Sequence, residues 1–170
     1  ELDNRGAPAI GKMEFGLRGA GYALCIIESG GDHSCVADEY SPIPGEMREI
    51  AAHFGKGYLR AVDKAEFIRA IPQLRTSAGD RAVLRALHFF DENRRAHDEA
   101  AALEEGRMDD FLALVNASGR SSHMYLQNVF PSGSSRHQAV GVALAMCGEL
   151  LGERGAYRVH GGGFAGTVQA

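Results

Sequence analysis

Apolar runs near both ends of the chain predict short β-strands. Residues 22–27 form a continuous apolar run that contains two isoleucines and is bounded by glycines, which is typical of a buried strand. Near the other end, residues 157–160 and 167–170 each mix apolar with polar side chains, as short half-buried strands do. The chain is therefore expected to begin and end its folded part in extended structure.

Between these strands, apolar residues recur three and four positions apart and predict helices. The first helix centres on residues 47–54 and ends at Gly55. The second begins with a capping-box pattern at residues 63–66, in which Asp takes the place of Ser or Thr. We expect this helix to end before Pro72, because the residue that precedes a proline disfavours helical backbone angles.

Three more helices are predicted in the second half of the chain. The longest runs from about residue 80 to residue 105, and a fourth covers residues 108–119. A fifth begins near Ser134 or Ser135 and ends at Gly152. Gaps between these periodic segments are expected to be loops.

Few strands, placed near the two ends, and several helices between them predict an α+β fold. We expect a small antiparallel sheet with helices packed on one face. Residues 1–20 are interpreted as a loop or extended N-terminal segment because they are polar and glycine-rich. Residues 119–135, which contain five Ser and two Gly, are interpreted as a surface loop.

Composition narrows the possible partners. The 170 residues are 45% apolar and 24% charged, which is ordinary for a globular protein, and the net charge of −4 provides no basic surface for nucleic acid. No apolar run approaches the roughly 20 residues of a membrane-spanning helix. Three widely spaced cysteines indicate a reducing compartment without a disulfide framework.

The chain carries a dense glycine cluster close to its end. Four of the six residues from Gly161 to Gly166 are glycine. Their spacing matches a dinucleotide-binding pattern, but a strand follows the loop where that pattern needs a helix. Consecutive glycines can present amide N–H groups to an anion such as phosphate, whereas glycine-rich strand connections without any ligand are equally common. The residues alone leave both interpretations open.

Several blocks together resemble the C-terminal half of galactokinases, which belong to the GHMP family of small-molecule kinases. Residues 158–166, Arg-Val-His-Gly-Gly-Gly-Phe-Ala-Gly, resemble the third motif of that family. Residues 85–95 resemble its long-helix block, in which His, Glu-Asn and Arg recur in the same register. Residues 38–40, Asp-Glu-Tyr, resemble the Glu-Tyr that follows the first strand of this half, and residues 111–116 lie where the family has a Phe-x-x-Leu helix.

The resemblance implies a domain and an activity. Residues 21–170 would form a GHMP-kinase C-terminal domain, truncated before its last elements, whose partner is an N-terminal domain of the same protein. The whole protein would be a cytoplasmic ATP-dependent sugar 1-kinase, most specifically a galactokinase, that transfers the ATP γ-phosphoryl group to the anomeric hydroxyl of galactose. ATP and Mg²⁺ would be bound mainly by the missing half. This chain alone is therefore expected to be inactive.

Two alternatives stay open beside galactokinase. Galactokinases usually have a pair of arginines where residues 41–44 of this chain read Ser-Pro-Ile-Pro, so a kinase of the same family could act on another sugar, such as N-acetylgalactosamine or a uronic acid. A non-catalytic sugar-sensing regulator could also be built on the same fold, since fold does not fix function.

The resemblance also implies site residues. Tyr40 falls where galactokinases place a tyrosine that contacts the sugar. Gly161, Gly162, Gly163 and Phe164 would form a loop on the phosphate and nucleotide side. No catalytic residue and no metal ligand is expected in this chain. His160 is expected to pack beside the loop rather than to take part in proton transfer.

Charged residues on the longest predicted helix favour structural roles. His88, Glu92 and Arg95 share one helix face and predict an intramolecular polar network. The arginines of this helix are balanced by nearby acidic residues, and we expect that face to be solvated. The arginines concerned are Arg81, Arg85, Arg94 and Arg95.

Overall fold

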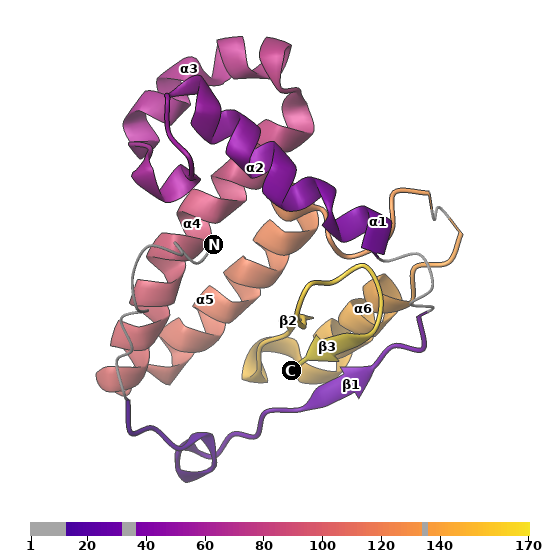
Figure 1. Cartoon of the computed structure of the whole chain (residues 1–170). Helices are drawn as coiled ribbons and strands as arrows, with labels where there is room; N and C mark the ends of the chain where they lie inside the picture. Colours follow the sequence, from indigo (N-terminus) through magenta and orange to yellow (C-terminus); the bar gives the residue numbers. More distant parts are fainter. Residues whose placement is uncertain (1–12, 32–36, 134–135) are drawn as a thin grey trace.

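The computed structural model describes residues 13–31, 37–133 and 136–170 and confirms the α+β fold (Figure 1). Its longer helices are α2 (Pro42–His53), α3 (Lys64–Ser77), α4 (Asp80–Glu104), α5 (Met108–Ser121) and α6 (Ala139–Leu151). The shorter ones are η1 (Leu17–Ala20), α1 (Ala37–Tyr40), η2 (Leu59–Ala61), the π-helical η3 (Ser122–Leu126) and η4 (Gly152–Arg154). The strands are β1 (Ile26–Glu28), β2 (Arg158–Val159) and β3 (Thr167–Gln169).

The three strands form one antiparallel sheet in the order β1-β3-β2. Val168 in the central strand lies opposite Val159 in β2, and both are buried. They pack with Val140 and Cys147 of α6, so this helix covers one face of the sheet. No helix within the described residues is long and apolar enough to cross a membrane.

The larger core lies among the helices, at the upper end of the molecule in Figure 1. Phe67 and Leu74 of α3 are fully buried against α2 and α4, and Phe67 stacks on Phe90 at a centroid distance of 5.1 Å. α3 begins as predicted, because the Asp63 side chain accepts a hydrogen bond from the Glu66 N–H at 2.9 Å.

The prediction that Pro72 ends this helix is wrong, since α3 continues through it to Ser77. A proline inside a helix removes one hydrogen-bond donor and disturbs the carbonyl four residues earlier, which here belongs to Ile68. That residue is 44% exposed, so water can satisfy its carbonyl. The fully buried Leu74, one turn further on, anchors the rest of the helix in the core.

The predicted surface loop at residues 119–135 is also wrong over its first half. α5 runs past Gly119 to Ser121, and η3 continues to Leu126. Gly119 does not end the helix; it allows close packing, because a Cβ there would lie 2.9 Å from the Tyr157 carbonyl oxygen. The chain leaves the helix at Gln127, whose φ of 59° is left-handed.

The first strand differs from its prediction in place and in burial. Residues 22–27 were expected to form a buried strand, but β1 covers Ile26–Glu28 and is an edge strand. Leu24, Ile26 and Ile27 are 61%, 50% and 39% exposed. A continuous apolar run predicts a strand that is covered by other elements on both of its faces. Within the described residues this strand pairs with β3 along one edge only, and its large apolar side chains stay exposed.

The remaining elements agree with the sequence more closely. The long helix α4 ends within one residue of its predicted end. α6 begins at Ala139, and the two serines proposed as its start lie outside the described residues. Of the segment 1–20, residues 13–20 are described and consist of extended chain and η1, while residues 1–12 lie outside the description.

Candidate functional site

The glycine cluster forms the connection between β2 and β3, as the sequence predicts. The hairpin closes below the loop with a hydrogen bond from the His160 N–H to the Thr167 carbonyl at 3.0 Å. Gly161 and Gly163 have φ angles of 62° and 84°, which only glycine adopts without cost, whereas Gly162 has no positive φ. Alternation of φ in this way turns successive N–H groups toward one concave side of a loop.

The tip of the loop offers unpaired hydrogen-bond donors. Among the described residues, no protein acceptor takes the N–H group of Gly161 or Gly162, whereas the Gly163 N–H closes the turn toward the His160 carbonyl. Gly161 and Gly162 are exposed, while the loop is buried from Gly163 onward. Free amide donors at an exposed tip above a fixed base suit an anionic oxygen, such as that of a phosphate group.

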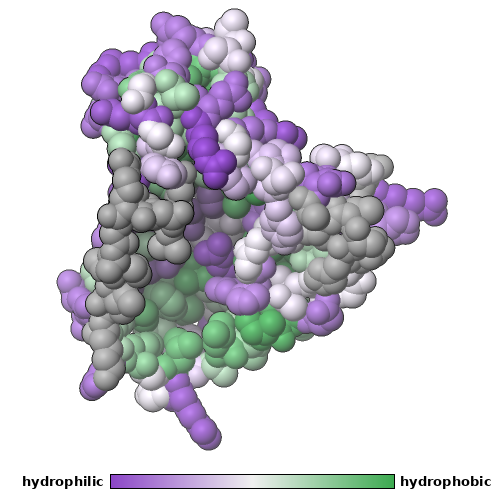
Figure 2. Space-filling view, in the orientation of Figure 1, coloured by the Kyte–Doolittle hydropathy of each residue, from purple (hydrophilic) through white to green (hydrophobic). Residues whose placement is uncertain are grey.

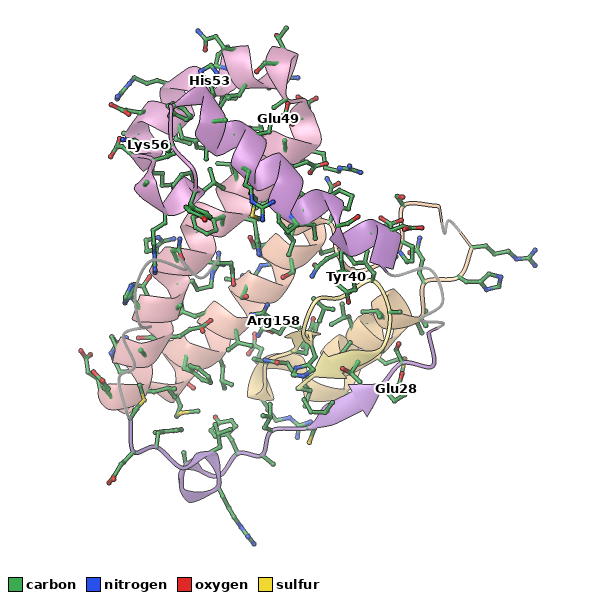
Figure 3. All side chains as sticks on the ribbon, viewed as in Figure 1. Glu28, Tyr40, Glu49, His53, Lys56 and Arg158 are labelled. Atoms are coloured by element: carbon green, nitrogen blue, oxygen red, sulfur yellow. The ribbon has the colours of Figure 1, made fainter. Side chains whose placement is uncertain are left out.

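Tyr40 lies directly against this loop although it is 123 residues from Gly163 in sequence (Figure 3). Its hydroxyl donates a hydrogen bond to the Gly163 carbonyl oxygen at 2.8 Å. Its ring meets the Phe164 ring edge to face, with centroids 5.3 Å apart. Tyr40 remains 37% exposed, so part of this residue is accessible to solvent.

The same tyrosine explains why residue 162 is glycine. A Cβ at Gly162 would lie 2.8 Å from both Cζ and Oη of Tyr40, too close for any side chain. Every residue that the sequence assigned to the sugar or phosphate side therefore falls in one place. Tyr40 contacts Gly162, Gly163 and Phe164, and Gly161 stands beside them with open space around it.

The base of the loop is held by a residue that the sequence analysis did not single out. Asn128, only 2% exposed, donates a hydrogen bond from Nδ2 to the Gly162 carbonyl oxygen at 2.9 Å. Its own backbone carbonyl accepts the Phe164 N–H at 2.5 Å. Asn128 was hidden within the predicted surface loop, and the only local signal is the polar Gln127-Asn128 pair in an apolar stretch.

Phe164 anchors the loop in the protein interior. It is 3% exposed and packs with Ala165 and Ile43, the latter from α2. Its φ of 62° is left-handed, which is uncommon for an aromatic residue. Such a conformation persists only where the surroundings fix it, here through the contacts with Tyr40 and Asn128.

A polar cluster joins α4 and α5 to β2, behind the loop. Glu92 pairs with Arg95 on α4, accepts a hydrogen bond from the Ser118 hydroxyl at 2.7 Å, and lies 3.8 Å from Arg158 of β2. His88 instead contacts the Ser121 hydroxyl at 2.9 Å. The predicted network therefore exists in part: Glu92 and Arg95 pair and extend to Ser118 and Arg158, whereas His88 hydrogen-bonds to Ser121 on α5.

Burial perturbs the titration of this cluster. It lowers the pKa of His88 to about 4, and the positive charges of Arg158 and Arg95 act in the same direction. Burial also raises the pKa of Glu99, which the same two arginines oppose. His88 is therefore neutral at physiological pH and has a structural position.

The expectation of a solvated arginine face on α4 is wrong for two of its members. Arg85 and Arg95 are 1% and 8% exposed. Arg85 donates to Glu46 Oε2 at 2.7 Å and to the Leu126 carbonyl oxygen at 3.2 Å. A guanidinium can be buried when such partners satisfy it, and periodicity alone cannot reveal partners on other helices.

The rest of the site supplies neither an acid–base pair nor a metal centre. His160 is exposed, and its Nδ1 forms a hydrogen bond of 3.0 Å with Gln169 Oε1 across the hairpin. Within the described parts of the chain, no three His, Cys, Asp or Glu side chains come together in a way that could hold a metal ion. The arrangement can bind and orient an anion beside an aromatic hydroxyl.

Comparison with known proteins finds similarity to galactokinases. No family model matches the chain. The galactokinase of Pasteurella multocida is 31% identical over 151 residues, which are 89% of this chain and 37% of that protein. The galactokinases of Haemophilus influenzae and Actinobacillus succinogenes are each 28% identical, over 87% and 86% of this chain and 36% of their own lengths.

The chain thus spans a little over a third of the length of the curated relatives it matches. Two lines of evidence meet here: the motif blocks that resemble galactokinases, and an alignment that covers nearly all of this chain. Over that length, the chain is similar to galactokinases.

Proposed function

We propose that the full-length protein containing this chain is an ATP-dependent sugar kinase, most specifically a galactokinase located in the cytoplasm. It transfers the ATP γ-phosphoryl group to the anomeric hydroxyl of galactose. Residues 21–170 supply the C-terminal domain, and an N-terminal domain supplies the ATP loop and the catalytic base. The chain described here is not sufficient for turnover.

One observation carries the proposal most strongly. The hydrogen bond from the Tyr40 hydroxyl to the Gly163 carbonyl joins the residue expected at the sugar to the loop expected at the phosphate. In phosphoryl transfer the acceptor hydroxyl and the γ-phosphorus must be adjacent, because positioning and electrostatic stabilisation dominate the catalysis. A tyrosine placed against a loop with free N–H groups provides both contacts within one site.

The glycine loop and Tyr40 would have separate roles in the reaction. In the loop of Gly161, Gly162 and Gly163, the exposed N–H groups of Gly161 and Gly162 would stabilise charge on the oxygens of the transferring phosphoryl group. Tyr40 would present its exposed ring and hydroxyl to the sugar. As the new bond from the anomeric oxygen to phosphorus forms, the bond from the γ-phosphorus to its bridging oxygen breaks. The hydroxyl proton passes to a base outside this chain.

ATP and Mg²⁺ fit this chain to different degrees. Free amide donors suit the phosphate oxygens of ATP. Within the described residues no three His, Cys, Asp or Glu side chains come together, and Mg²⁺ would arrive with ATP and be held mainly by the rest of the protein.

A second sugar substrate remains the principal alternative. Residues 41–44, which include Ser41 as the residue before α2, take the place of the arginine pair usual in galactokinases. A changed residue so close to Tyr40 would alter contacts with the substituents of the sugar. N-acetylgalactosamine and uronic acids are therefore the substrates to compare with galactose.

The test is a coupled ADP-release assay on the full-length protein with ATP, Mg²⁺ and each sugar in turn. We expect galactose-dependent release from the full-length protein and none from residues 1–170. Preference for another sugar would replace galactokinase by the related kinase. Sugar binding without ADP release would support the non-catalytic sensor. Turnover by residues 1–170 alone would contradict the division of work proposed here.

A further inference from the structure

The segment that follows α5 places one buried side chain against the glycine loop. η3 ends at Leu126, and the left-handed Gln127 turns the chain so that Asn128 faces the loop. Gln127 N–H donates back to the Ser122 carbonyl oxygen at 2.8 Å, which fixes the turn. The position of Asn128 is therefore fixed by the hydrogen-bonded turn that ends η3.

Asn128 contacts two successive peptide groups of the loop. Its Nδ2 donates to the Gly162 carbonyl oxygen, and its backbone oxygen accepts the Phe164 N–H. The fit is close, because a Cβ at Gly163 would lie 2.7 Å from Asn128 Nδ2 and 2.9 Å from its Cγ. Only glycine at position 163 permits this approach.

These contacts fix the base of the loop. Gly163 is buried, and the turn at Gly161 and Gly162 closes its N–H back toward the His160 carbonyl, so this N–H is not a donor at the exposed tip. The peptide between Gly163 and Phe164 has its N–H on Asn128 and its carbonyl on Tyr40, so these two residues hold it from opposite sides. The exposed tip, Gly161 and Gly162, whose N–H groups have no acceptor among the described residues, therefore stands on a base held by Asn128 and Tyr40.

Packing alone does not account for an asparagine here. Among the described residues, the buried Oδ1 of Asn128 has no hydrogen-bond partner. A buried polar atom without a partner costs stability, and a leucine of similar volume would avoid that cost. The amide is thus explained by its Nδ2 contact with the loop.

We propose that Asn128 is a positioning residue for phosphoryl transfer: its amide holds the Gly162 carbonyl and thereby fixes the exposed tip of the loop, so that the N–H groups of Gly161 and Gly162 face the transferring group. The proposal rests on the proposed kinase function. Asn128 touches neither substrate and acts through the loop. Its loss should affect kcat more than the KM for either substrate.

The test compares Asn128→Leu with Ser122→Ala in the full-length protein. Ser122 is a matched control, because it lies in the same turn and its hydroxyl is buried without a partner in the described structure. We expect Asn128→Leu to lower kcat about tenfold, the effect of roughly one hydrogen bond, and to change KM for galactose and ATP less than about twofold. Ser122→Ala should change neither.

Amide hydrogen exchange gives a second readout that does not depend on activity. Asn128→Leu keeps the backbone acceptor of the Phe164 N–H but removes the side-chain bond to Gly162, so a loosened loop should make the Phe164 amide exchange about fivefold faster, while the His160 amide, which pairs across the hairpin, should keep its rate. If Asn128→Leu fails to fold, Asn128→Ala provides the same comparison with a smaller side chain.

The outcomes separate this proposal from the one on which it rests. Lower kcat together with faster Phe164 exchange supports it. Faster exchange with unchanged kcat would reduce Asn128 to a structural residue, and unchanged exchange would show that it does not hold the loop; either result overturns the proposal. Absence of any sugar-dependent turnover by the wild-type protein would overturn the proposed function, and this proposal with it.

Discussion

The helical region, formed by α2 to α5, and the sheet region, formed by β1 to β3 and α6, bury their apolar residues to different extents. Within the described residues, seven core residues of the helical region are completely buried: Ile50, Ala51, Leu59, Phe67, Leu74, Ala86 and Ala102. The sheet region has a smaller core and leaves large side chains exposed: Leu24, Ile26, Ile27, Val142, Met146 and Leu150. Figure 2 shows polar side chains over the helices at the upper end and hydrophobic ones along the lower part of the same face.

The difference shows where the candidate site obtains its rigidity. The glycine loop belongs to the sheet region, whose own core is thin. Its fixed conformation comes from Tyr40 on α1 and Asn128 after η3, which join it to the helical elements. Stability should therefore depend mainly on the helical core, and activity on the few polar contacts that join the glycine loop to the helical elements.

The largest effect should come from the helical core. Phe67→Ala removes a fully buried ring and should lower the free energy of unfolding by about 3–5 kcal/mol, measured by urea denaturation. Ile68→Ala is the matched control: its side chain, next along α3, is 44% exposed and should cost less than about 1 kcal/mol. Similar losses in the two variants would contradict the assignment of the core.

Substitution of Tyr40, which joins the glycine loop to α1, should change the kinetic constants more than the stability. In the full-length protein, Tyr40→Ala should raise the KM for sugar more than the KM for ATP. Loss of one hydrogen bond and of ring packing costs roughly 1–3 kcal/mol, about a 5- to 150-fold change. Tyr40→Phe keeps the ring and separates the two contributions. A rise in the KM for ATP alone would remove Tyr40 from the sugar side.

The smallest effect should be a pH dependence of stability that arises from His88, in the polar cluster between α4 and α5. The pKa of His88 is about 4 in the folded protein and near 6.5 in the unfolded chain, so only the unfolded chain gains a proton as pH falls between these values. Stability should drop by about 1 kcal/mol between pH 7.5 and pH 5.5. His88→Gln should lose this part of the pH dependence, and equal slopes in both proteins would contradict the assignment.

Much of the helical region could be predicted from the sequence, because its signals are local. The periodicity of α4 and the Asp63 cap give nearly the observed elements. The predictions were wrong where contacts between residues far apart in the sequence determine where a helix ends. Leu74 carries α3 past Pro72, and Gly119 packs against β2 instead of ending α5.

The site could be predicted in part. The glycine run predicted positive φ angles and a strand-to-strand loop, which the structure has at Gly161 and Gly163. Two features could not be found in the sequence, since they depend on contacts across the fold. Gly162 is required by the approach of Tyr40, and Asn128 reaches the loop from a segment interpreted as surface loop.

The most direct test of the account is Gly162→Val in the full-length protein, with kcat and thermal unfolding measured on one preparation. We expect kcat to fall at least about tenfold, roughly 1.4 kcal/mol of barrier, because the side chain would displace Tyr40 and close the loop to phosphate. The melting temperature should stay within about 3 °C of the wild type, as it should in the control Gly57→Ala, whose surroundings are open. Full activity in Gly162→Val, or parallel loss of activity and stability, would contradict a role of the loop in catalysis.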